Sequence, residues 1–344
     1  MNKSKLIFVL AVVFTFTMIS AQEGKLYVVT TFSDYASIVK EIGGDYVTVD
    51  HLSHGDQDPH FVPPKPSLAI KLKKADLFIT TGLDLELWAT TLLDKARNKK
   101  IMDGAIGYVT VYPGIELLQK PTTALSRTEG DIHVYGNPHI HTSPRNWIPI
   151  SENILIGLKK VDPDHASYYE ERQKRFVDRV YRAMFGDELV DLIGGQQLMD
   201  LVKAGTFFDF IEREFRGEKL VKRLGGWMKK AMPLHGKEVI AYHKNWAYFA
   251  HDFGMKVLGY IEPKPGIPPT PKHVEKMIKL IKDSGIDVML VADYFEKRKP
   301  TTIAQKTGIM ALFLPLSVGG NPEVSDNFKL MDYWIDHIVE AVSE

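Results

Sequence analysis

The sequence predicts an α/β protein with two lobes, each built on a parallel sheet, and one long helix that joins them. Short β-rich runs alternate with segments of helical periodicity between residues 25 and 82, and again between residues 238 and 314. Between the two series, residues 162–185 keep one apolar face over roughly 35 Å of helix. The chain has 344 residues, which is enough for two units that each bury a core.

The charge balance argues against nucleic acid as the main partner. The chain carries 43 basic and 43 acidic side chains, for a formal net charge of +0, whereas phosphate binding normally leaves a basic patch. Its 44% of hydrophobic and 25% of charged residues are ordinary for a soluble globular protein. Nucleic acid is therefore not an expected partner.

The first residues predict export. Two lysines precede an apolar run from Leu6 to Ile19, and small residues follow it. This is the pattern of a signal peptide over residues 1–21, and the run is too short to span a bilayer comfortably. The sequence contains no cysteine, which excludes a disulfide scaffold, a thiolate metal site and a lipid attached at the cleavage point. We expect a soluble periplasmic protein that is a monomer.

The first lobe is expected to cover residues 22–150. The strands of a parallel sheet end on one rim, where ligands bind in such folds. Periodicity is lost between residues 112 and 136, so we expect a surface loop there. The predicted elements are a strand at 25–31, a helix at 34–41, a strand at 46–52, a helix capped by Ser67 and a strand at 76–81.

A linking helical segment is expected over residues 151–186, with Asp162 as an N-cap and Pro163 as the first helical residue. The second lobe then covers residues 187–344. Its first part, about 187–232, is rich in Leu, Phe and Lys and is interrupted by glycines, so we expect extra helices there. The remaining elements are strands at 238–242, 257–261, 286–292 and 310–314, and a helix that opens at Thr270 and Pro271.

Three histidines occupy equivalent places in the two lobes. His60 lies in a proline-rich loop after the second strand, His139 lies in another proline-framed loop, and His243 ends a strand. A neutral imidazole held by a rigid loop is a good ligand for zinc, although each of them alone would be read as a solvated loop residue. His133 and His141 flank His139 and are candidates for assisting metal delivery. Solvated side chains are expected at His54, His165, His251 and His273.

Four motifs follow one another in a fixed order. Residues 55–67 read Gly-Asp-Gln-Asp-Pro-His-Phe-Val-Pro-Pro-Lys-Pro-Ser, and residues 82–88 read Gly-Leu-Asp-Leu-Glu-Leu-Trp. Residues 137–139 read Asn-Pro-His, and residues 242–249 read Tyr-His-Lys-Asn-Trp-Ala-Tyr-Phe. Together they resemble the cluster A-I family of ABC-transporter solute-binding proteins, which capture zinc or manganese in the periplasm. The resemblance covers most of residues 25–342.

The resemblance implies two (β/α)₄ lobes with parallel sheets, one long rigid helix between them, and a metal site in the cleft between the lobes. It implies His60, His139 and His243 as metal ligands. The third motif departs from the family at two positions, because Asn137 stands where Asp is usual and His141 stands where Trp is usual.

The fourth ligand is the main departure. The family usually supplies an Asp in a Leu-Asp-Pro-Leu context, whereas residues 313–316 read Phe-Leu-Pro-Leu, so Leu314 replaces the carboxylate. Either water or a neighbouring carboxylate would complete the shell. Asp293 is the candidate, because it ends a strand on the same rim. The alternative is that Asp293 orients His243 or a helix terminus.

We predict a periplasmic receptor that binds Zn²⁺ and passes it to an ABC import permease and its ATPase. Three imidazoles with at most one carboxylate suit tetrahedral zinc, whereas Mn²⁺ prefers more oxygen ligands. The alternatives are the same role for Mn²⁺, another divalent metal or a chelated metal, and a zinc hydrolase, since three histidines and an open position also describe a catalytic zinc. The chain has no His-Glu-x-x-His motif, so we do not expect an enzyme.

Overall fold

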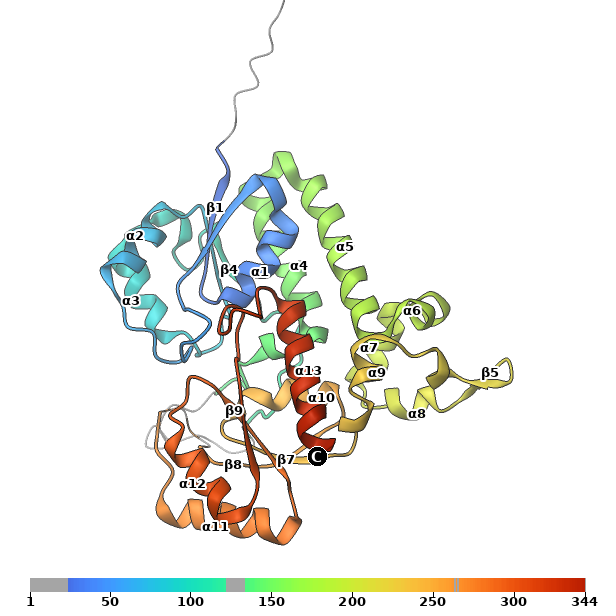
Figure 1. Cartoon of the computed structure of the whole chain (residues 1–344). Helices are drawn as coiled ribbons and strands as arrows, with labels where there is room; N and C mark the ends of the chain where they lie inside the picture. Colours follow the sequence, from blue (N-terminus) through green and yellow to red (C-terminus); the bar gives the residue numbers. More distant parts are fainter. Residues whose placement is uncertain (1–23, 122–133, 263, 265, 344) are drawn as a thin grey trace, which may run out of the picture.

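The computed structural model describes residues 24–121, 134–262, 264 and 266–343 (Figure 1). The predicted signal peptide and His133 lie outside these residues. Two parallel four-stranded sheets form the framework, one in each half of the chain. The predicted α/β class with parallel sheets is thereby confirmed. No helix in the described part of the chain combines the length and the apolar character that crossing a bilayer needs.

The first sheet has the strand order β2-β1-β3-β4, with all neighbours parallel. Its side chains alternate between two faces, as the pleat of a strand requires. Val28 and Ile79 pack under helices α1 and α4, whereas Val29 and Phe78 pack under α2 and α3. The elements are β1 (Leu26–Thr30), α1 (Ser33–Gly43), β2 (Val47–His51), α2 (Pro66–Lys74), β3 (Leu77–Thr80), α3 (Leu87–Ala96), β4 (Tyr108–Thr110) and α4 (Pro144–Val161).

The second sheet has the strand order β10-β9-β7-β8 and is also parallel. Met289 and Val291 face α11 and α12, and Leu290 faces the interior of the molecule together with Trp334 of α13. The elements are β7 (Glu238–Ala241), α10 (Ala247–Asp252), β8 (Lys256–Tyr260), α11 (Pro271–Ser284), β9 (Val288–Ala292), α12 (Arg298–Thr307), β10 (Met310–Leu314) and α13 (Asn327–Ser343).

Helix α5 (Ala166–Phe185) connects the two halves. It packs against α1 and α4 on the side of the first sheet and against α7 and α9 further on (Figure 1). Phe176 and Val180 place its apolar face in the interior, as the sequence predicts. Its start differs from the prediction. Residues Pro163–His165 form a 3-10 turn, and the Asp162 side chain accepts from Tyr169 instead of capping the helix.

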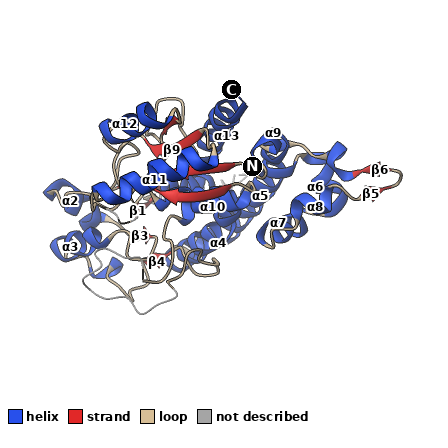
Figure 2. Cartoon of the chain, turned by 90° about the horizontal axis from the view of Figure 1, so that it is seen from below, coloured by secondary structure: helices blue, strands red, loops and turns tan. Residues whose placement is uncertain are grey.

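Residues 187–232 form short helices and also an antiparallel hairpin that the sequence did not predict. The hairpin projects away from both sheets in the two views (Figures 1 and 2). The elements are α6 (Asp187–Ile193), α7 (Gly195–Lys203), α8 (Phe207–Ile211), β5 (Glu214–Phe215), β6 (Glu218–Lys219) and α9 (Gly226–Lys230).

The largest hydrophobic core is shared by the two halves. It includes Val28 and Ile79 of the first sheet, Leu290 of the second, and Trp334 of α13, all of them fully or almost fully buried. Two smaller cores lie on the outer faces, one under α2 and α3 and the other under α11 and α12. The two sheets are therefore packed against common helices, which leaves little freedom for one to rotate against the other.

Candidate metal centre

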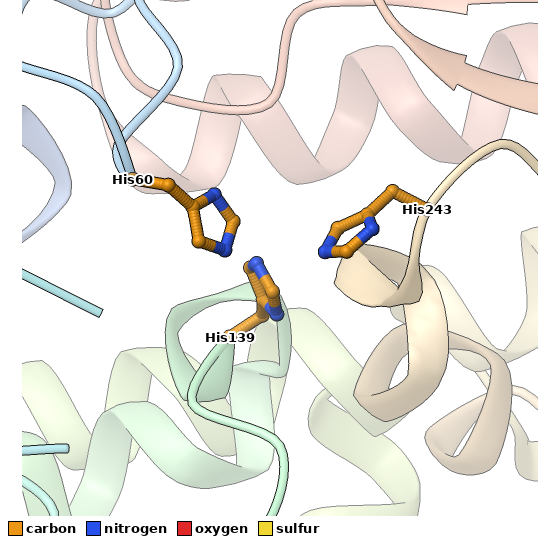
Figure 3. Close-up of side chains that lie close together, drawn as sticks. All are labelled: His60, His139 and His243. Carbon is orange, nitrogen blue, oxygen red and sulfur yellow. The ribbon is translucent and has the colours of Figure 1, made fainter. Parts of the chain in front are cut away.

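Three loops bring His60, His139 and His243 together, and their imidazole rings point toward one another (Figure 3). His60 lies between β2 and α2, on the carboxyl-end rim of the first sheet. His139 precedes a 3-10 turn and α4, and His243 follows β7 of the second sheet. Both halves of the chain therefore contribute to one cluster.

His60 is fixed by a turn that its own loop supplies. Oδ1 of Asp58 accepts from the backbone N–H of His60 at 3.0 Å and lies 2.8 Å from its Nδ1. A carboxylate only accepts, so Nδ1 carries the hydrogen and Nε2 is left to face the cluster. Trp88 holds the same loop by donating from Nε1 to the Pro59 carbonyl at 2.8 Å. The side chain of Asp58 thus shapes the loop that carries His60.

His139 is held by the same device. Oδ1 of Asn137 accepts from the backbone N–H of His139 at 2.9 Å and from its Nδ1 at 2.8 Å. The Asx-Pro-His order in both loops produces this geometry, because the side chain of the first residue folds back over the proline to reach the third. His139 is fully buried, and His60 is 8% exposed.

His243 is held by the backbone. Its Nδ1 donates to the carbonyl of Glu262 at 2.8 Å, which leaves Nε2 as the acceptor. Nε2 is buried and has no hydrogen-bond partner among the described residues. Burial, together with the nearby His60, lowers the pKa of His243 to about 3. The ring is therefore neutral at physiological pH, which is the form that binds a metal ion.

The three rings form a compact triangle. Their centroids lie 5.1 Å apart for His60 and His139, 5.3 Å for His60 and His243, and 5.4 Å for His139 and His243. One nitrogen of each ring lies within 4.8 Å of the others. Nitrogens bound to tetrahedral zinc at 2.0–2.1 Å would be about 3.3 Å apart. A small inward movement of the rings would therefore enclose such an ion.

Neither Asp293 nor Leu314 joins this triangle. Leu314 is fully buried in the shared core, where it ends β10 and pairs with Ala292. Asp293 follows β9 on the rim, and its backbone N–H donates to the Leu314 carbonyl at 2.9 Å. Burial and the neighbouring Asp56 raise the pKa of Asp293, and its Oδ1 has no hydrogen-bond partner in the described part of the chain.

Sequence reasoning missed two residues beside the cluster, Glu262 and Tyr294. The Glu262 carbonyl fixes His243, and its buried carboxyl group accepts from the N–H of Gly266 at 3.0 Å. The Tyr294 hydroxyl accepts from Asn245 at 3.2 Å behind the His243 loop. Glu262 belongs to a segment that resembles the family, so its position could have been noticed. A backbone acceptor has no signal in the sequence.

The chain is similar in sequence to known metal-transport proteins. A family model described as zinc-uptake complex component A, periplasmic, matches residues 28–183 and 218–341. The manganese ABC transporter substrate-binding lipoprotein PsaA of Streptococcus pneumoniae is 22% identical over 327 residues, which are 93% of this chain and 90% of PsaA. The zinc-binding lipoprotein AdcA of the same species is 22% identical over 288 residues, 83% of this chain and about half (49%) of AdcA.

Solved structures share the fold. A zinc-bound deletion mutant of ZnuA has a TM-score of 0.67 at 21% identity, with 93% of this chain and 99% of that chain covered. A manganese-bound periplasmic metal-binding protein from Candidatus Liberibacter asiaticus has a TM-score of 0.62 at 20% identity, with 92% and 100% covered.

The family match settles the class of protein. It extends over both sheets and both outer pairs of helices, and it leaves out only the segment between residues 183 and 218 inside the matched region. The family consists of transport proteins, so the hydrolase alternative is set aside. This chain belongs to the zinc-uptake complex component A family, the metal-binding substrate-binding proteins of ABC transporters.

Proposed function

We propose that this chain captures Zn²⁺ in the periplasm and delivers it to an ABC import permease and its ATPase. His60, His139 and His243 are the proposed ligands, and the ion is the cargo of the protein. The observation that carries the proposal is the convergence of three buried imidazoles, each held from behind through Nδ1. Since one chain supplies all three, we propose that it acts as a monomer.

The donor set favours zinc over manganese. Imidazole nitrogen is a common zinc ligand and supports four-coordinate geometry, whereas Mn²⁺ is better matched by carboxylate, carbonyl and water oxygens. The relatives are divided, because PsaA is named for manganese and AdcA for zinc. The choice therefore rests on the three nitrogens and on Leu314, whose side chain offers no oxygen.

Asp293 is the carboxylate that we propose for the fourth position. It is half-buried on the rim of the second sheet, and its Oδ1 has no hydrogen-bond partner among the described residues. It does not lie within 4.8 Å of all three imidazoles, so it would have to move inward when the ion binds. Water takes the position if it does not.

We propose the division of the chain into segments that the sequence predicts. Residues 1–21 are the signal peptide, residues 22–150 the first lobe, residues 151–186 the linking segment and residues 187–344 the second lobe. We propose an insertion at about 187–232, and the family match supports its first part, because the match is interrupted between residues 183 and 218. The shared core opposes rotation of the lobes, so release would depend on small shifts and on movement of the His60 loop.

The proposal is tested by titrating the mature, metal-free protein with Zn²⁺ in competition with a chelator, beside a triple variant with His60, His139 and His243 changed to Ala. The triple variant should lose tight binding. His54→Ala is the matched control, because His54 is an exposed histidine of the same loop, and its affinity should equal that of the wild type. Equal affinity in the triple variant and the wild type would reject the function.

The choice of metal needs its own measurements. Parallel titration with Mn²⁺ should give weaker binding than Zn²⁺, and the opposite order would assign the manganese role. Metal analysis combined with native mass spectrometry of protein purified without added metal distinguishes a bare ion from a chelated one, because a bound chelator would add its mass to the complex. Asp293→Ala should weaken zinc binding if Asp293 supplies the fourth ligand, and leave it unchanged if water does.

A further inference from the structure

The two histidine turns of the first lobe differ in one chemical group. In each turn a side-chain oxygen, from Asp58 or Asn137, accepts from the N–H and from Nδ1 of the histidine two residues later. The other polar atom of each side chain, Oδ2 of Asp58 or Nδ2 of Asn137, has a different environment in the two turns. The Asp58 side chain is 24% exposed, whereas Asn137 is 1% exposed.

The amide nitrogen of Asn137 reaches into the second lobe. Nδ2 donates to the backbone carbonyl of Lys244 at 2.7 Å and to Oε1 of Gln119 at 3.0 Å. The orientation of the amide is fixed by its partners, because the backbone N–H of His139 can only donate and the Lys244 carbonyl can only accept. A carboxylate could accept from the N–H of His139, but it could not donate to the Lys244 carbonyl.

The backbone of Asn137 is tied to the same segment. The Tyr248 hydroxyl donates to the Asn137 carbonyl at 2.6 Å and accepts from the N–H of Leu118 at 3.2 Å. Lys244 directly follows His243, and Tyr248 lies about one helical turn after Lys244. Asn137 therefore links the turn that holds His139 to the segment that carries His243, through both its side chain and its backbone.

We propose that Asn137 is a positioning residue that sets the separation of His139 and His243 across the lobes, and that its amide is required for tight metal binding. This inference rests on the proposed function, since it assigns a role to the neighbour of a proposed ligand. It also gives a reason for the departure from the usual Asp, because the residue must donate a hydrogen bond as well as accept one.

Asn137→Asp should weaken binding even though a carboxylate is the usual partner of a metal-binding histidine. The new oxygen would face the Lys244 carbonyl, which can only accept, in a buried place. Gln119 can turn its amide toward the new oxygen, because the Tyr260 hydroxyl, 2.5 Å from its Nε2, can donate as well as accept. The Lys244 carbonyl cannot adapt in this way, so the contact across the lobes is lost. With the link broken, we expect zinc affinity to fall on the order of 10–100-fold, the range found for groups that orient a ligand.

The test compares zinc affinities of the full mature protein and two reciprocal variants. Asn137→Asp should show the large loss. Asp58→Asn is the matched control, because an amide oxygen can still accept from His60 and no donor is needed there, so its loss should be smaller. If Asn137→Asp binds zinc as tightly as the wild type, or if Asp58→Asn loses as much, the inference is overturned.

A second readout separates positioning from general stability. Co²⁺ in the site reports ligand geometry through its visible absorption, and Asn137→Asp should change that spectrum at saturating Co²⁺. An unchanged spectrum with only a lower melting temperature would overturn the positioning role. If Asn137→Asp fails to fold, Tyr248→Phe removes the backbone link and should lower zinc affinity, and unchanged affinity would overturn the inference. Unchanged affinity in a folded His139→Ala variant would instead reject the proposed function.

Discussion

Replacing His141 with Phe should make the metal-free protein more resistant to acid. His141 is 2% exposed and packs against the rings of Phe32 and Tyr35, with centroid distances of 5.5 and 6.4 Å. Neither ring nitrogen has a hydrogen-bond partner among the described residues. Burial, with a smaller contribution from the nearby His60, lowers the pKa of His141 to about 3. A phenyl ring would keep the aromatic contacts without this cost.

The size of the effect follows from the shift in pKa. An unfolded histidine has a pKa of about 6.5, so below that pH the unfolded chain binds a proton that the folded protein refuses until about pH 3. The free energy of unfolding therefore falls as the pH falls from about 6.5 toward 3. Between about pH 7.5 and pH 5, His141 accounts for a loss of about 2 kcal/mol. His243, with its pKa also lowered to about 3, accounts for a similar loss.

The assay is urea unfolding of chelator-treated protein across this pH range. The free energy of unfolding of His141→Phe should fall by about 2 kcal/mol less than that of the wild type on going to about pH 5. At about pH 7.5 the variant should already be more stable by about 1 kcal/mol, because two buried nitrogens without partners are gone. Parallel pH profiles for the two proteins would refute the reasoning.

Two further predictions concern buried carboxyl groups. Burial raises the pKa of Asp34 to about 7 despite the opposing contacts of Ser317 and Val318, so its contribution to stability is present below about pH 3.8 and lost as the pH rises through 7. Asp34→Asn should therefore increase the free energy of unfolding by up to about 4 kcal/mol at about pH 8. Urea unfolding measures this, and no gain in stability would contradict the prediction. Asp252 accepts from Arg145 at 3.0 Å, so Asp252→Asn should cost about 3–5 kcal/mol by leaving a buried charge unpaired, and an unchanged melting temperature would argue against it.

The regular elements could be predicted where the local pattern and the packing agree. The apolar run that becomes β9 is buried on both faces, as its composition indicates. The starts of α2 and α5 could not be predicted. We expected Ser67 to cap α2, but Pro66 already occupies the first turn and Lys65 precedes it. A proline can begin a helix one residue earlier than a capping side chain suggests, because its φ angle is already suitable.

The site could be predicted as far as its ligands lie in local motifs. The contact of Asp58 with His60 spans two residues, so the motif that contains them also contains the geometry. The contact of Asn137 with Lys244 spans 107 residues and ends on a backbone carbonyl. In the sequence, Asn137 was visible only as a departure from a family pattern. The convergence of the rings likewise depends on how the two lobes pack.

The core that both sheets share also determines how the molecule comes apart. Because Val28, Leu290 and Trp334 belong to one apolar cluster, unfolding either lobe alone would expose apolar surface on the other. Such a partial opening would have a free energy close to that of complete unfolding, and it would rarely be populated. The described part of the chain has two parallel sheets and two outer cores, yet the protein should behave as a single cooperative unit in equilibrium denaturation.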